Sequence, residues 1–224
     1  MADFKFMIDD ERGNKVLGLP EPYPKSIKIS FLGKNNTIDF RGCDVSKLKS
    51  ADFTVKGDGS SLVIGKVRKV GHLRVTMRDG AEITIADDVS FEDVYLLATN
   101  GKSISIGRDC MFSFRVVLRT TDAHGIYDLG SGDVINAPGN ITIGNHVWLG
   151  QAVIVAKDTV LEDNTIVGAM SYVRKIKGQP NTIIVGVPAK VVRENVIWDR
   201  RMTENIFDDE ADLDPLFKKW LHNG

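Results

Sequence analysis

The chain has 224 residues, 42% of them hydrophobic, which is enough apolar material to build the core of one domain. Its formal net charge of −1 creates no field that would attract nucleic acid or an anionic membrane. No apolar run approaches membrane-spanning length, and the first residues lack the basic and apolar regions of a signal peptide, so we expect a cytoplasmic protein without a membrane span.

The N-terminal region and the first repeats come next in chain order. Residues 1–30 are charged, contain proline and show no clear period, so we expect a lead-in over the first coil. Similar four-residue phrases then occupy 62–65, 83–86 and 104–107, beginning at intervals of 21 residues, and the phrase returns at 141–144. We interpret each of these intervals as one coil of about eighteen residues plus a short bulge.

A stricter repeat occupies the second half of the chain. Aliphatic residues stand there at every sixth position, namely Ile143, Leu149, Val155, Leu161, Val167 and Val173. A period of six fits neither an amphipathic helix nor a simple strand, but it matches one flat face of a parallel β-helix. Three such steps make a triangular coil whose aliphatic side chains stack in the interior. The sequence therefore predicts an all-β solenoid over residues 31–193.

The repeat is interrupted once, between about residues 120 and 140. This stretch is rich in Gly, Asp, Asn and Pro and has lost the six-residue phase, which predicts a loop inserted at one edge of the solenoid. Insertions of this kind are where binding and catalytic groups concentrate, because the coils supply a rigid support. The loop contains one histidine, His124, within Thr121–Asp128.

The last predicted region is a helical cap over residues 194–224. Trp198, Met202, Ile206 and several later apolar residues fall at mostly helical spacings. A cap is expected because a β-helix without one would leave an open strand edge.

Three features together carry a family resemblance. They are the six-residue row, the segment 144–150 (Gly-Asn-His-Val-Trp-Leu-Gly) and the ending 186–193 (Gly-Val-Pro-Ala-Lys-Val-Val-Arg). The chain resembles the left-handed β-helix acyltransferases over residues 62–195, most closely the O-acetyltransferases of sugars and of bacterial capsule or O-antigen polysaccharide. The resemblance implies a left-handed parallel β-helix, a homotrimer with active sites between subunits, acetyl-coenzyme A as donor, a carbohydrate acceptor and no metal.

The catalytic base is predicted in the inserted loop. Acetyl transfer to a sugar hydroxyl needs a group of near-neutral pKa to take the hydroxyl proton, and histidine is suited to this. His124 matches the loop histidine that serves as base in the family. Either Asp122 or Asp128 would orient the imidazole, and the sequence does not distinguish them. Neither Cys43 nor Cys110 is placed to suggest a covalent acyl-enzyme.

The resemblance also assigns the coenzyme-binding residues. Trp148 would line the acyl-coenzyme A or acceptor pocket, although an aromatic residue on a solenoid face could also be a plain packing residue. Gln151 would contact the coenzyme near its thioester through its amide, and Ala169 would lie along the pantetheine. Four cations would reach the phosphates, namely Arg174, Lys175, Lys190 and Arg193. Arg174 departs from the pattern of the family, in which a small hydroxyl residue is frequent, and all four could instead form a solvated basic rim.

The acceptor and the competing functions stay open at this level. Arg115 and Arg119 face either an anionic sugar or solvent, and Tyr127 either stacks on a sugar or anchors the loop. A zinc enzyme of the same solenoid class would need a pair of histidines five residues apart, which this chain lacks. The same solenoid could also serve as an N-acetyltransferase acting on an amino-sugar nucleotide or small amine, or as a non-catalytic scaffold. His72, His146 and His222 are interpreted as solvated or structural, with His146 pointing outward.

Overall fold

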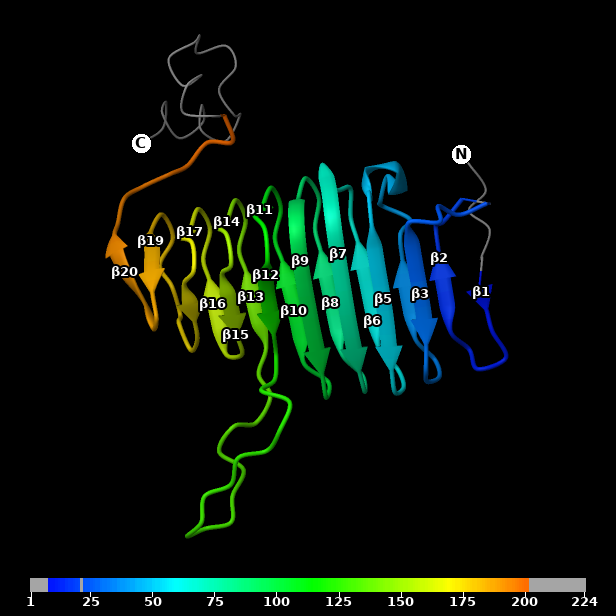
Figure 1. Ribbon diagram of the computed structural model, residues 1–224, viewed down its shortest axis with the longest axis horizontal. Helices are drawn as coiled ribbons and strands as arrows, with labels where there is room; N and C mark the ends of the chain where they lie inside the picture. Colours follow the sequence, from blue (N-terminus) through cyan, green and yellow to red (C-terminus); the bar gives the residue numbers. More distant parts are fainter. Residues whose placement is uncertain (1–7, 21, 202–224) are drawn as a thin grey trace.

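The computed structural model describes residues 8–20 and 22–201. These residues wind into a long solenoid of three-sided coils, with an extended segment leaving one edge near the middle of the chain (Figure 1). The described part contains one short 3-10 helix, η1 (Val45–Lys47), and otherwise strands and turns. Within it, no helix has the length and apolar content needed to cross a bilayer.

The first face of the solenoid is an eight-stranded sheet, in which every pairing is parallel except that of its first two strands. Its strands in sheet order are β1 (Ile8–Asp9), β2 (Lys15–Leu17), β4 (Thr37–Asp39), β6 (Ser61–Ile64), β8 (Glu82–Ile85), β10 (Ser103–Ile106), β13 (Ile141–Ile143) and β16 (Thr159–Leu161). From β2 onward, neighbours in this order are one coil apart, as a solenoid requires.

The second and third faces belong to one twelve-stranded sheet, because β7 (Lys69–Arg78) and β9 (Ser90–Thr99) bend from one face into the next. The second face also contains β11 (Met111–Phe112), β14 (Trp148–Leu149), β17 (Ile166–Val167), β19 (Ile183–Gly186) and β20 (Ala189–Arg193). The third face also contains β3 (Ile27–Phe31), β5 (Ala51–Lys56), β12 (Val116–Arg119), β15 (Ile154–Ala156) and β18 (Tyr172–Val173).

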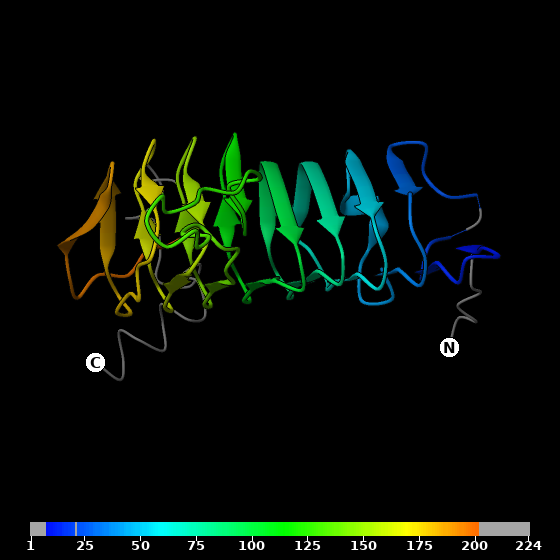
Figure 2. The same ribbon diagram turned by 90° about the horizontal axis from the view of Figure 1, so that it is seen from below.

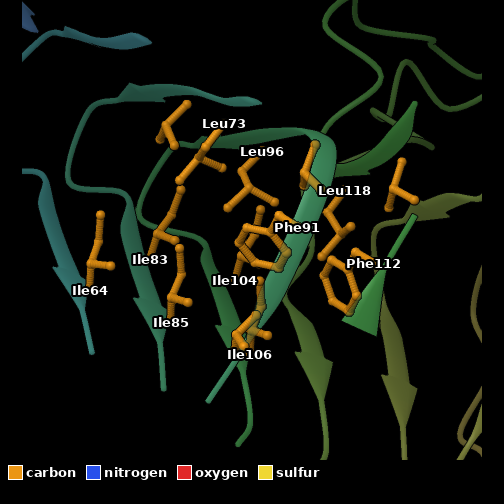
Figure 3. Close-up of a cluster of buried hydrophobic side chains, with 14 of the residues drawn as sticks. Ile64, Leu73, Ile83, Ile85, Phe91, Leu96, Ile104, Ile106, Phe112 and Leu118 are labelled. Atoms are coloured by element: carbon orange, nitrogen blue, oxygen red, sulfur yellow. The ribbon is translucent and has the colours of Figure 1, made fainter. Parts of the chain in front are cut away.

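The interior is filled by columns of apolar side chains, which confirms the predicted stacking. The six residues of the six-residue row are at most 2% exposed. The N-terminal phrases stack in the same way, since Ile64 pairs with Ile85, and Ile85 with Ile106 (Figure 3). Phe91 and Phe112 lie in the same interior with ring centroids 5.0 Å apart. Burial of this continuous apolar column is the main stabilising contribution to the coils.

The corners of the C-terminal coils also repeat every six residues. The small or β-branched corner residues from Val147 to Ser171 are buried, and the residue before each of them has a positive φ between 53° and 61°. These residues are His146, Ala152, Asp158, Asn164 and Met170. Asp158, Asn164 and His146 are of types enriched in this left-handed region, so the repeat imposes the conformation chiefly on Ala152 and Met170.

Two predicted details of the N-terminal half need correction. The coils begin before residue 31, because β2 already pairs in parallel with β4, and β3 with β5. The 21-residue repeats do not consist of a short coil plus a bulge. Their additional residues lengthen the third face, where the second part of β9 pairs over six residues from Val94 to Thr99, whereas β15 has three residues in all.

The C-terminal end of the solenoid closes with a hairpin rather than another coil. β20 runs antiparallel to β19, and residues 194–201, which we call the strap, then return along the edge between the first and second faces (Figure 1). The strap has no helix, so Trp198 is not part of one. The remainder of the predicted helical cap, residues 202–224, lies outside the described residues.

Candidate active site

The inserted segment, residues 120–140, forms an arm that leaves the solenoid between β12 and β13 (Figure 1). The arm is a narrow hairpin, with Tyr127 opposite Val134 and a hydrogen bond from Ile135 N to Ile126 O of 2.9 Å. Seen from below, it leans toward the C-terminal coils (Figure 2). The predicted loop is confirmed, and it is the only long excursion from the coils within the described residues.

His124 lies on the first leg of the arm, with an exposed side chain. Its backbone carbonyl accepts a hydrogen bond of 2.8 Å from Asn136 Nδ2 on the second leg. In residues 8–20 and 22–201, no hydrogen bond reaches the imidazole ring, so the ring is presented to solvent while the backbone behind it is held. This is a suitable arrangement for a group that must meet a substrate proton.

The two candidate orienting carboxylates lie in different surroundings. Asp122 Oδ2 accepts hydrogen bonds from Lys157 Nζ at 2.6 Å and from Asn136 Nδ2 at 3.2 Å. The bond from Lys157 is the main reason that the pKa of Asp122 lies below its ordinary value. Asp128 instead accepts the backbone N–H groups of Gly130 and Ser131 at 2.8 and 2.9 Å. It closes the turn at the tip of the arm, and those two N–H groups lower its pKa, Ser131 first.

Two residues of this network were missed by the sequence analysis. Lys157 is 1% exposed and lies at the corner between the third and first faces, one coil beyond the arm. Asn136 is 7% exposed and lies near the end of the arm. A lysine two residues after Val155 in the six-residue row is the one signal that could have been used, because a corner position is a poor place for a long cation unless it has partners. Nothing in the sequence distinguishes Asn136 from the other polar residues of the loop.

The candidate acceptor residues divide between two places. Arg119 Nε donates to Thr121 O at 2.7 Å, which places it at the root of the arm. Tyr127 is 61% exposed on the arm itself. Arg115 is exposed at the corner between the second and third faces, where its φ is 58°. The structure therefore brings Arg119 and Tyr127 together with the arm and leaves Arg115 on a different edge.

The candidate coenzyme residues near the thioester lie along the second face. Trp148 is 37% exposed in β14. Gln151 and Ala169 are both exposed at the next corner, one coil apart, and Met170 N donates to Gln151 O at 2.8 Å. Within one chain this row and the arm belong to different edges of the solenoid.

The four candidate phosphate-binding cations are all exposed, but they also divide. Arg174 and Lys175 follow β18 at the corner from which the arm leaves, and the charge of Arg174 contributes to lowering the pKa of Asp122. Lys190 and Arg193 lie in β20, which pairs with β19 of the second face. A single chain thus presents two pairs of cations rather than one cluster.

His146 is not the outward-pointing residue that the repeat predicts. It is 1% exposed, because the strap covers it and the Trp198 ring stacks on the imidazole with centroids 4.2 Å apart. Trp198 Nε1 also donates to the His146 carbonyl at 2.7 Å, and the same indole lies 5.9 Å from the ring of Trp148. The prediction that His146 points outward is therefore wrong, and its contacts with the strap are those of a structural residue.

Three further titratable groups, Cys110, Cys43 and His72, lie away from the arm. Burial raises the pKa of the Cys110 thiol to about 12, and burial raises that of Cys43 to about 11. Both thiols therefore stay protonated at neutral pH, which makes them poor nucleophiles. His72 lies between Asp93, at 3.1 Å, and Asp52, at 3.3 Å, on the third face, as a structural residue would.

The parallel three-sided coils, with one long arm that carries an exposed histidine, make the protein a parallel β-helix solenoid. No family model matches the chain. A polysialic acid O-acetyltransferase of Neisseria meningitidis is 35% identical over 210 residues, which cover 83% of this chain and 96% of the relative. A putative lipopolysaccharide biosynthesis O-acetyl transferase of Escherichia coli is 31% identical over 133 residues, or 53% of this chain and 65% of the relative.

A solved structure extends the similarity to the fold. The polysialic acid O-acetyltransferase OatWY superposes with a TM-score of 0.68 at 27% identity, covering 88% of this chain and 92% of that one. The chain belongs to the left-handed β-helix O-acetyltransferase family that includes the meningococcal enzyme, and it is an O-acetyltransferase. The family resemblance and the fold class expected from the sequence are both confirmed.

Proposed function

We propose that this enzyme transfers acetyl from acetyl-coenzyme A to a hydroxyl of a sialic-acid-containing or related anionic surface polysaccharide, with His124 as general base. The observation that carries the proposal is the single histidine exposed on the arm, above a backbone that Asn136 holds. The similarity to a relative named as a polysialic acid O-acetyltransferase supports the acceptor class. The proposal includes the cytoplasmic location, where the donor thioester is present.

The reaction follows from direct attack. The acceptor hydroxyl adds to the thioester carbonyl while the His124 imidazole takes its proton, and a tetrahedral intermediate forms. The intermediate collapses with loss of the coenzyme thiolate, which receives the proton from the imidazolium, so the histidine returns to its neutral form. Arg119, at the root of the arm, is positioned to attract an anionic acceptor. Neither this step nor the product requires an acyl-enzyme.

The proposal includes the homotrimer with active sites between subunits. Five apolar side chains on the arm are 50% exposed or more, which is typical of a surface that another subunit covers. They are Ile126, Tyr127, Leu129, Val134 and Ile135. A neighbouring subunit would also allow the arm of one chain to meet the Trp148 row of another, and the two pairs of cations to serve one coenzyme. Light scattering of the purified protein measures this assembly.

The test is release of free coenzyme A with purified protein, acetyl-coenzyme A and a panel of acceptors. We expect turnover with sialic acid polymers and little with neutral glucose oligomers, and a base-labile ester in the product. A base-stable amide would assign N-acetyl transfer instead, and absence of turnover with every acceptor would favour a scaffold.

The His124→Ala variant tests the base. We expect turnover to fall by about 10²–10⁴-fold, as is usual for the loss of a general base, while assembly and coenzyme binding are unchanged. The matched control is His72→Ala, which removes a histidine on the third face and should leave turnover near the wild-type value. Near-normal turnover of His124→Ala would contradict the assignment.

A further inference from the structure

The buried ammonium of Lys157 joins the two legs of the arm. The side chain is 1% exposed, and Nζ donates to Asp122 Oδ2 on the first leg at 2.6 Å and to the backbone carbonyl of Asn136 on the second leg. A buried cation is destabilising unless it is paired and hydrogen-bonded, so these contacts are needed wherever the lysine stays in the corner. The coil therefore holds both legs of the arm through the ammonium group of Lys157.

The side chain of Asn136 adds hydrogen bonds at His124 and on both sides of it in the chain. Its Nδ2 donates to Asp122 Oδ2 at 3.2 Å and to the carbonyl of His124 at 2.8 Å, and its Oδ1 accepts from Ile126 N at 2.7 Å. The backbone is thus held at His124 and at Ile126, and the side chain of Asp122 is held two residues before His124. All of these bonds meet at Asn136, whose backbone carbonyl accepts a hydrogen bond from Lys157.

These contacts affect the position of His124 rather than the stability of the solenoid. The coils are held by parallel strand pairing and an apolar interior, to which the arm contributes no strand of the solenoid. An exposed loop, in contrast, does not hold a side chain within the small tolerance that proton transfer requires unless neighbouring groups fix it. The contacts of Lys157 and Asn136 fix, from a rigid corner of the coils, the backbone from which the His124 side chain projects.

We propose that Lys157 is a positioning residue for acetyl transfer, which acts through Asp122 and Asn136 to hold His124 where the acceptor hydroxyl arrives. The inference rests on the proposed role of His124 as the base. In this proposal the main role of Asp122 is to link the arm to the coil, because its Oδ2 accepts hydrogen bonds from both Lys157 and Asn136.

The experiment measures steady-state kinetics with acetyl-coenzyme A and the best acceptor for four proteins. They are Lys157→Met, His124→Ala, the double variant, and Lys177→Met as a matched control at an exposed position of the next coil. We expect Lys157→Met to lower kcat by about 10- to 100-fold, since a displacement of about 1 Å has effects of that size. The KM for the coenzyme should stay within about twofold of wild type, and Lys177→Met should behave as wild type.

The double variant identifies the path of the effect. If Lys157 acts through His124, the double variant should have the same residual turnover as His124→Ala alone. A further multiplicative loss, a normal kcat in Lys157→Met, or a raised coenzyme KM with an unchanged kcat would each overturn the inference. If His124→Ala retains turnover, the proposed function fails instead, and the two failures are therefore distinguishable.

A second variant covers the case in which Lys157→Met does not fold. Asn136→Leu leaves Lys157 and its contact with Asp122 in place. It removes the hydrogen bonds that the side-chain amide of Asn136 makes to His124 and Ile126. It should show the same fall in kcat with little change in coenzyme KM, and faster hydrogen exchange of the arm amides. Wild-type kinetics of Asn136→Leu would overturn the inference as well.

Discussion

The coils and the arm are held by different chemistry. In the coils, each aliphatic side chain lies between equivalent side chains one coil before and one coil after, and the backbone bonds repeat with them. One lost contact therefore removes only a small part of the interactions that hold the column together. In the arm, five large apolar side chains are exposed, and between its two ends the arm is attached to the coils through the buried Lys157. A change at one residue there should release the segment without melting the solenoid.

This difference separates stability from activity along the chain. The coils supply a rigid frame whose sequence tolerates exchange among apolar residues of similar volume. The arm supplies His124, whose usefulness depends on a small number of polar contacts with specific geometry. Substitutions in the two regions should accordingly appear in different measurements, and three predictions test that expectation.

The largest effect on stability is expected in the core. Phe112 is 0% exposed and stacks on Phe91, so Phe112→Ala leaves a cavity that the repeated neighbours are not free to fill. We expect the free energy of unfolding to fall by about 3–5 kcal/mol, measured by chemical denaturation. Ser131→Ala at the tip of the arm is the comparison and should change it by about 0.5 kcal/mol or less. Equal losses in the two variants would show that the coils and the arm unfold as one unit.

A smaller effect is expected in the strap, which is irregular like the arm but anchored like the core. Arg200 donates to Asp109 Oδ1 and to Ser90 Oγ, both at 2.8 Å, and to the carbonyl of Cys110 at 3.0 Å. Arg200→Ala leaves these acceptors without their cation, so we expect a loss of about 1–3 kcal/mol in the free energy of unfolding. Lys69→Ala, which removes an exposed ion pair with Glu92, should cost about 1 kcal/mol or less.

If Arg200→Ala lowers the free energy of unfolding no more than Lys69→Ala does, the strap, like the arm, contributes little to the stability of the core. Tryptophan fluorescence is a second reading of the same variant, because the indole of Trp198, one of three in the chain, stacks on His146 only while the strap is docked. We expect a shift of its emission to longer wavelength in Arg200→Ala at temperatures where the coils stay folded.

Much of the fold was predictable because its period is written in adjacent residues. Ile143 and the five aliphatic residues that follow it at intervals of six identify the coils without any knowledge of contacts. The start of the solenoid was not predictable in this way. β2 has only three residues, and the longer third face of the 21-residue coils hides the six-residue step.

The site was predictable only where it depends on residue type. A lone histidine in a loop that breaks the repeat has a chemical meaning by itself, so His124 could be singled out. The partners of Lys157 and Asn136 could not be identified, because they lie 35 and 14 residues away in the chain and only the fold brings these groups together. His146 was misplaced for the same reason, since the indole that buries it is 52 residues further along.

The smallest effect concerns acid pH and the arm alone. The pKa of Asp122 is lowered in the folded protein, chiefly by the hydrogen bond from Lys157, so the ionised carboxylate favours the docked arm. A lowered folded pKa contributes stability above the unfolded pKa, about 3.9, and that contribution is lost as the pH falls below it. Between pH 5 and 7 the arm should be held, and near pH 3 its attachment to Lys157 should weaken while the apolar coils persist.

Hydrogen exchange of the arm amides, corrected for the intrinsic pH dependence, measures this attachment. We expect protection at Ile126 and Ile135 to decrease at pH 3 relative to pH 6, while amides of β13 stay protected. Asp122→Asn supplies the matched control, because it cannot ionise and should show low arm protection at both pH values. Protection of the wild-type arm that is the same at pH 3 and pH 6 would mean that the carboxylate is not what holds the arm to the coil.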